Sequence, residues 1–188
     1  MKKKIFLLLG CLLSTISIKA QDEAIYVYGV DFTQVKVYAA DESVEQFAEA
    51  FKGINMLLIT ECDKYDFTKM LNARVRVDVE EVVSKLSLCN YSNMLVLGTA
   101  YKELDYGSIV RGYNLQQSEG TGVVLIAKFL NKVSAEATYE LVLFDIYTRE
   151  ILCQKEVVGK ARGFGLRNFW AGSVYNIIRT TRIHVTQE

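Results

Sequence analysis

Proline is absent from the 188-residue sequence, and histidine and tryptophan occur once each. Average proline usage is about 5%, so its absence removes proline-rich linkers and polyproline ligand motifs from consideration. The one histidine, His184, is four residues from the C-terminal end. Hydrolases of the Ser-His-Asp type hold their histidine between a nucleophile and a carboxylate, and a chain end is a poor mount for such a group. We therefore expect no catalytic triad.

Metal-binding and cofactor-binding motifs are also missing. No Cys-x-x-Cys spacing supports a thioredoxin-like redox centre or a zinc site. Neither the Walker motif nor a dinucleotide fingerprint occurs. Two groups of carboxylates lack the alternating ligands and glycine-assisted turn of a calcium site. These are Glu61, Asp63 and Asp66, and Asp78, Glu80 and Glu81. The sequence thus predicts no metal and no cofactor, and it favours a protein that is not an enzyme.

Long apolar segments are missing after the N-terminal region. There, three lysines at positions 2–4 precede the apolar run 5–13, and the small residue Ala20 follows. This order is that of a cleavable secretory signal, and the run is shorter than the roughly 20 residues of a transmembrane helix. We predict cleavage after Ala20 (signal peptide 1–20) and a periplasmic or secreted chain. The alternative is a lipobox at Leu8-Leu9-Gly10-Cys11, which would make the protein an outer-membrane lipoprotein through Cys11.

Charge of neither sign dominates, because 22 basic and 22 acidic residues balance. Four of the lysines lie within residues 1–20, so cleavage would leave 18 basic residues against 22 acidic ones, a formal charge of −4. Phosphate contacts demand clustered lysine and arginine, so this balance argues against nucleic acid as a partner. With 51% hydrophobic residues and no linker-like stretch, residues 21–188 are predicted to form a single domain.

Three cysteines follow the predicted signal. An oxidising compartment permits a disulfide, and Cys62 with Cys89 is the pair that we expect if one forms. Cys153 stands in an apolar alternation typical of a buried strand, so it is predicted to behave as a small hydrophobic residue.

Hydrophobic spacing predicts alternating strands and helices in the first half of the chain and consecutive strands in the second. Ser43 and Gln46 have the spacing of a capping box, and Gly53 is placed to end the helix that follows. Helices are expected over residues 44–52, 66–72, 79–86 and 166–178, and strands over 25–38, 54–60, 94–101, 123–130, 137–146 and 150–158. A helix continuing through Leu58 is the alternative at 54–60. The predicted fold is α+β, with a mixed, largely antiparallel sheet covered by two to four helices.

The second half of the chain resembles a group of bacterial envelope domains. Residues 137–181 contain a strand, an Asp-x-x-Thr turn from Asp145 to Thr148, a returning strand, the Gly159-Lys160-Ala161 end and a helix. This order is similar to that of the curli-secretion pore subunit, the outer-membrane lipoprotein activators of penicillin-binding proteins and the N-terminal domain of the Tol translocation protein. The resemblance implies an adaptor or assembly module rather than an enzyme, although a fold alone does not fix function.

Two segments carry candidate binding residues. Lys160, Arg162 and Arg167 surround a glycine-rich turn ahead of a helix N-terminus, where free backbone amides can hold an anion. They predict an anionic ligand, and the alternative is a flexible connection with solvated charges. A polar stretch at 102–122 has tyrosines in or beside it, and tyrosine favours interfaces. Tyr101, Tyr106 and Tyr113 are therefore candidate interaction residues, and the alternative is that they lie at the edge of the core.

Together these features favour a non-enzymatic interaction or assembly module of the bacterial envelope, which binds another envelope protein or itself. An open edge strand in the sheet would support a homodimer, because unpaired edges seek partners. The alternative function is a small-ligand (anion) binding protein or hydrolase with its site near residues 159–167.

Overall fold

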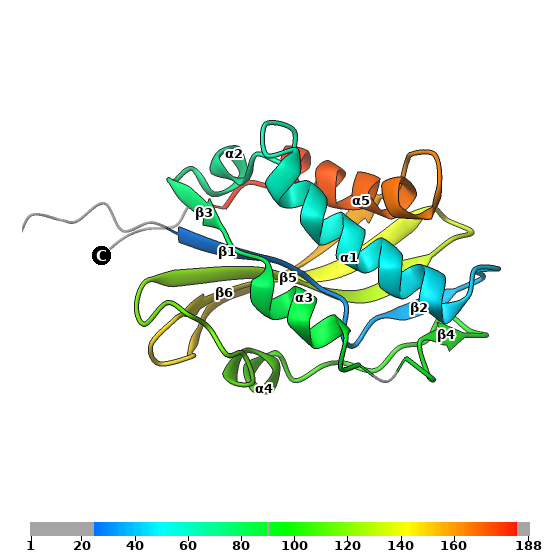
Figure 1. Ribbon diagram of the computed structural model, residues 1–188, viewed down its shortest axis with the longest axis horizontal. Coiled ribbons are helices and arrows are strands. Elements are labelled where there is room, and N and C mark those ends of the chain that lie inside the picture. Colours follow the sequence, from blue (N-terminus) through cyan, green and yellow to red (C-terminus); the bar gives the residue numbers. More distant parts are fainter. Residues whose placement is uncertain (1–24, 90, 184–188) are drawn as a thin grey trace, which may run out of the picture.

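The computed structural model describes residues 25–89 and 91–183, which fold around one hydrophobic core (Figure 1). The predicted export signal, Cys11 and His184 lie outside the described residues. Among the helices that the structure describes, none is both long enough and apolar enough to cross a membrane.

Within the described residues the sheet has seven strands, and the longest of them is its central strand. In chain order the strands are β1 (Ile25–Asp31), β2 (Lys36–Tyr38), β3 (Val75–Val77), β4 (Leu95–Val96), β5 (Thr121–Asn131), β6 (Glu136–Asp145) and β7 (Ile151–Lys160). On one side, β5 pairs in parallel with β1 and, further along its length, with β2. Strand β3 in turn pairs in parallel with β1, and β4 pairs in parallel with β2. On the other side, β6 and β7 complete an antiparallel meander.

The predicted α+β fold with a largely antiparallel sheet is wrong, because parallel pairings join β1, β2, β3, β4 and β5. The fold is instead a mixed α/β arrangement with a sheet of parallel strands. The parallel partners lie far apart along the chain, and Val27 for example pairs with Val123. Three of these strands have only two or three residues, which is too short for a readable alternation.

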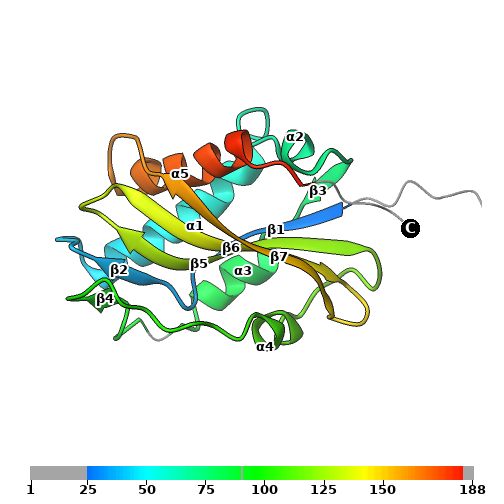
Figure 2. The same cartoon turned by 180° about the vertical axis from the view of Figure 1, so that it is seen from behind.

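The helices of the described residues are α1 (Val44–Thr60), α2 (Phe67–Leu71), α3 (Glu80–Leu86), α4 (Tyr106–Arg111) and α5 (Leu166–Thr180). Three of them, α1, α3 and α5, cover one face of the sheet (Figure 1). Figure 1 shows α1, α3 and α5 in front of the sheet, and Figure 2 shows the sheet in front of them. The segment between β4 and β5, which includes α4, packs against the opposite face, where the Tyr113 and Tyr101 rings meet those of Phe144 and Phe129.

Helix α1 begins as predicted, with Ser43 and Gln46 forming the reciprocal capping box. It then runs through Gly53 to Thr60, so the predicted end at Gly53 and strand at 54–60 are wrong and the continued helix is confirmed. The buried stripe of the helix continues past the glycine. Asn55, which is fully buried, accepts from the backbone amide of Val30 at 2.8 Å and donates to its carbonyl at 2.9 Å. This side chain joins α1 to β1.

Strand β7 is an edge strand, since among the described residues it pairs with β6 alone. Helix α5 packs over its second half, where Val157 and Gly159 are buried, and residues 152–156 are exposed. Cys153 lies in this exposed part, so the prediction that it is buried is wrong. Cys62 and Cys89 are also free thiols, and the disulfide considered between them is not formed here.

Candidate anion-binding groove

The connection between β7 and α5 is a packed turn. The backbone amide of Arg162 donates to the carbonyl of Phe169 at 3.0 Å. Gly172 makes this contact close, because a Cβ there would lie 2.1 Å from the carbonyl oxygen of Arg162. Gly163 and Gly165 have φ angles of +148° and +77°, in a region that residues other than glycine rarely adopt. The backbone that carries the predicted cations is therefore fixed to α5.

This turn forms one wall of a groove of about 1010 Å³. The other walls are α5 and the connection between α1 and α2, near Tyr65. Five cations line the groove, together with one carboxylate and three aromatic rings. The cations are Lys64, Lys160, Arg162, Arg167 and Arg179, the carboxylate is that of Glu61, and the rings are those of Tyr65, Phe164 and Tyr175.

Most of the groove cations have no carboxylate partner. Lys64 is paired with Glu61 at 3.0 Å. Among the residues that the structure describes, no carboxylate lies within 4.0 Å of the side chains of the other four cations, Lys160, Arg162, Arg167 and Arg179. The groove therefore carries an uncompensated positive charge.

Aromatic rings and amides hold some of these cations in place. The Lys64 ammonium lies 5.0 Å from the centre of the Tyr65 ring, and the Arg179 guanidinium lies 5.6 Å from that of Tyr175. Arg167 donates from Nε to the side-chain oxygen of Asn168 at 3.1 Å and crosses α1 at the position of Gly53. The unusual glycine within α1 thus makes room for a groove residue.

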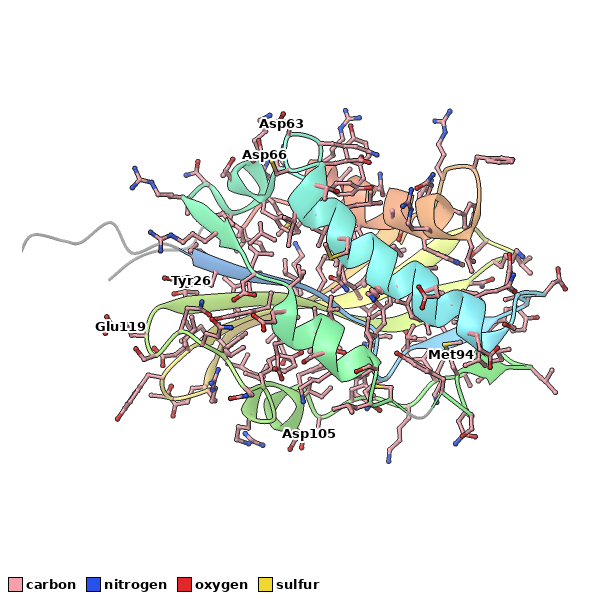
Figure 3. The ribbon with its side chains drawn as sticks, viewed as in Figure 1. Tyr26, Asp63, Asp66, Met94, Asp105 and Glu119 are labelled. Carbon is pink, nitrogen blue, oxygen red and sulfur yellow. The ribbon has the colours of Figure 1, made fainter. Side chains whose placement is uncertain are left out.

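Two acidic residues near this end of the molecule, Glu61 and Asp66, are engaged in local contacts. Figure 3 shows Asp63 and Asp66 in the connection between α1 and α2. The carboxylate of Asp66 caps α2 by accepting from the backbone amide of Thr68 at 3.0 Å and pairs with Lys69 at 3.2 Å. The hydrogen bond from the Thr68 hydroxyl, together with these contacts, holds the pKa of Asp66 below its usual value. No metal-ligand cluster of three or more groups occurs in the part of the chain that the structure describes.

The structure brings together the three predicted ligand-binding residues, Lys160, Arg162 and Arg167. It adds Lys64 and Arg179, which sequence reasoning missed. Arg179 is seven residues beyond Gly172 and four beyond Tyr175, so a helical projection of α5 places it on the same face as these groove residues. Lys64 reaches the groove only through the packing of α1 against α5, and nothing local in the sequence signals that position.

The three predicted interaction tyrosines pack against the sheet. Tyr106 and Tyr113 are buried and Tyr101 is half-buried. The hydroxyl of Tyr113 donates to the Asp31 carboxylate at 2.7 Å, and both burial and this carboxylate raise the pKa of Tyr113. These residues therefore hold the 97–120 segment on the sheet, and Tyr101 alone of the three keeps part of its ring accessible.

A second charged cluster lies under this segment, around Lys128. This residue stands at a bulge in β5 and is 4% exposed. Its ammonium lies 2.7 Å from Glu156, 3.5 Å from Glu103 and 3.6 Å from Glu140. Burial lowers the pKa of Lys128, but hydrogen bonds with Glu156 and Tyr106 outweigh it and raise the value overall. The amine stays protonated, so it cannot serve as a nucleophile or general base at neutral pH.

The carboxylates of this cluster differ in environment. Glu140 is 6% exposed, and burial raises its pKa. Glu103 is largely exposed, and hydrogen bonds from Tyr106 and Lys128 lower its pKa. Sequence reasoning missed this cluster, although a lysine within the apolar strand 123–130 was a signal, because a buried lysine requires carboxylate partners. We interpret the cluster as the attachment of the 97–120 segment to the sheet.

Comparisons with protein-family models, with curated proteins and with solved structures find no match for this chain. The resemblance of residues 137–181 to bacterial envelope modules therefore stays a prediction from the sequence.

Proposed function

We propose that this protein is a non-enzymatic binding module of the bacterial envelope and that its basic groove holds an anionic ligand. One observation carries the proposal: four cations without a carboxylate partner, and a fifth paired with Glu61, converge on one groove in a chain whose charges balance. Arginine forms paired hydrogen bonds with phosphate and carboxylate groups, so Arg162, Arg167 and Arg179 suit such a ligand.

The composition of the groove supports binding rather than catalysis. Its described lining contains no histidine, cysteine or serine, its one carboxylate is paired with Lys64, and the hydroxyl of its threonine, Thr180, donates to the backbone carbonyl of Asn176 at 2.8 Å. Acyl or phosphoryl transfer through a protein nucleophile needs a nucleophile that an adjacent base activates. The fixed backbone around Gly172 supports a preformed site, which lowers the entropic cost of binding.

The test is a calorimetric titration with inorganic tripolyphosphate. The double substitution Arg162→Ala/Arg167→Ala should weaken binding at least tenfold per arginine, because a hydrogen bond to a charged group contributes about 1.5–3 kcal/mol. The matched control, Arg76→Ala/Arg111→Ala, removes two exposed arginines outside the groove and so changes the net charge equally. Equal dissociation constants for the two variants would contradict the proposal.

The exposed edge of β7 supports a second candidate, the predicted binding of an envelope protein or of a second copy. Unpaired amides and carbonyls at a sheet edge can pair with another strand. Leu152 and Val158 are large exposed hydrophobic residues on this strand. We expect sedimentation equilibrium to show a concentration-dependent dimer that Leu152→Lys/Val158→Lys abolishes. A wild-type monomer up to millimolar concentration would refute self-association.

Localisation in the periplasm or outside the cell, or at the outer membrane through Cys11, remains part of this proposal.

A further inference from the structure

The rim of the groove exposes a phenylalanine at a fixed position. Phe164 is 96% exposed and lies between Gly163 and Gly165. The backbone amide of Arg162 is bonded to α5, and a Cβ on Gly163 would lie 2.5 Å from the carbonyl oxygen of Asn168. The connection that carries Phe164, drawn in orange, projects beyond the start of α5 in both views (Figures 1 and 2). A packed turn thus holds an apolar ring in water.

The cations extend along the groove from this ring. Lys160 and Arg162 precede Phe164, and Arg167 follows it. Arg179 is twelve residues beyond Arg167 on α5, which corresponds to about 18 Å along the helix axis. A single small anion cannot contact cations spread over this length, and it leaves the Phe164 ring in water. The arrangement calls for a ligand with many anionic groups and an apolar part.

We infer that the groove and its rim dock on the surface of an anionic phospholipid bilayer, with Phe164 entering the interface and the cations contacting headgroup phosphates. This inference rests on the anion-binding function proposed above. Aromatic side chains favour the membrane interface, and basic residues near an anionic surface add attraction. The core of a protein interface is instead apolar and, arginine apart, depleted in charge, whereas five cations line this groove.

The docking is peripheral and reversible. A basic residue near an anionic surface contributes about 1 kcal/mol, which is roughly a fivefold change in partitioning. The four cations without a carboxylate partner and one aromatic ring can therefore hold the protein at a bilayer without a transmembrane helix. Electrostatic attraction of this kind weakens as salt is raised, because the Debye length falls from about 10 Å at 0.1 M to about 3 Å at 1 M.

The experiment is sedimentation of the purified protein with vesicles of phosphatidylcholine alone or with one third phosphatidylglycerol. We expect binding to the anionic vesicles only, released by salt. Phe164→Ser should lower the partition coefficient about tenfold, since it removes the apolar contribution of the ring. Tyr147→Ser removes an 81%-exposed ring from the β6–β7 turn and is the matched control. In Phe164→Trp, the fluorescence emission of the new tryptophan should shift to the blue on anionic vesicles. The emission of Trp170, which is fully buried, should not shift.

Each other outcome overturns the inference in a distinguishable way. Equal binding to both vesicle types, or unchanged vesicle binding by Phe164→Ser, removes the docking role of the ring and cations. Tripolyphosphate binding without vesicle binding leaves the anion-binding function standing and refutes the membrane. Binding of polyglutamate but not of vesicles, sensitive to Phe164→Ser, identifies an acidic protein instead. If the wild-type protein binds neither tripolyphosphate nor vesicles, the inference and the proposed function are refuted together.

Discussion

Replacing Lys128 by methionine tests whether the buried charge cluster attaches the 97–120 segment to the sheet. The substitution keeps the length of the side chain and removes its charge. It leaves Glu140, which is 6% exposed, beside Glu103 and Glu156 without a cation. Removing one partner of a buried ion pair costs about 3–5 kcal/mol. We expect a loss in this range at pH 7, because Glu103 and Glu156 are exposed enough to be hydrated but Glu140 is not.

The loss should depend on pH with a definite sign. Burial already raises the pKa of Glu140 above its ordinary value of 4.5, and loss of the neighbouring cation raises it further. A carboxyl group with a raised pKa in the folded state destabilises that state when it ionises, so its contribution is most favourable below its unfolded pKa. The destabilisation by Lys128→Met should therefore shrink as pH falls towards 4.5, where Glu140 binds a proton.

The assay is urea unfolding at pH 7 and pH 4.5, followed by the fluorescence of Trp170. If the slope of the unfolding free energy against urea concentration (the m value) is unchanged by the substitution, a change in the urea midpoint reports a change in stability. Lys155→Met, on the exposed part of β7, should change the unfolding free energy by less than about 0.5 kcal/mol. Adding Glu140→Gln to Lys128→Met should recover most of the loss at pH 7. A loss below about 1 kcal/mol at pH 7, or an equal loss at both pH values, would refute the reasoning.

Two further predictions concern the groove and the thiols. Gly172→Ala should lower the unfolding free energy by about 1–3 kcal/mol and weaken tripolyphosphate binding, because the new Cβ would meet the carbonyl oxygen of Arg162. Gly98→Ala, which enters open space, is its control in the same urea and calorimetric titrations, and equal effects of the two would contradict the packed turn. In the native protein Cys62 should react with a disulfide reagent faster than Cys89, because Cys62 is exposed and burial raises the pKa of the Cys89 thiol. The reaction of each thiol can be followed by absorbance, and equal reaction rates of Cys62 and Cys89 would contradict this order.

The parts of the fold that the sequence predicted well have local signals. The meander was expected at 123–130, 137–146 and 150–158 and lies at β5, β6 and β7, because its strands are adjacent and joined by short turns. The capping box of Ser43 and the helix at 166–178 were also identified correctly. Each of these elements is determined by residues within a few positions of each other.

The parts that failed depend on distant contacts. The predicted strand at 94–101 shrinks to Leu95–Val96, which pairs with β2. The polar stretch 102–122, for which no helix was predicted, contains α4, which Asp105 caps by accepting from the backbone amide of Ser108. Its tyrosines are buried because the segment folds over the sheet, and polarity along the chain does not reveal that contact. The parallel pairing of β1 with β5 is equally invisible before the helices and strands between them in the chain are placed.

The two charged clusters explain why the groove, and not Lys128, is the candidate binding site. The chain holds as many carboxylates as cations, so a shortage of acids does not account for the unpaired arginines. The fold surrounds Lys128 with three carboxylates, of which one is buried, and this cation needs no further partner. Near Arg162 and Arg167 the same chain places no carboxylate within pairing distance among the described residues, and it fixes the turn with Gly172. A cation that the protein leaves unpaired at a rigid position remains available for an anion from outside the chain.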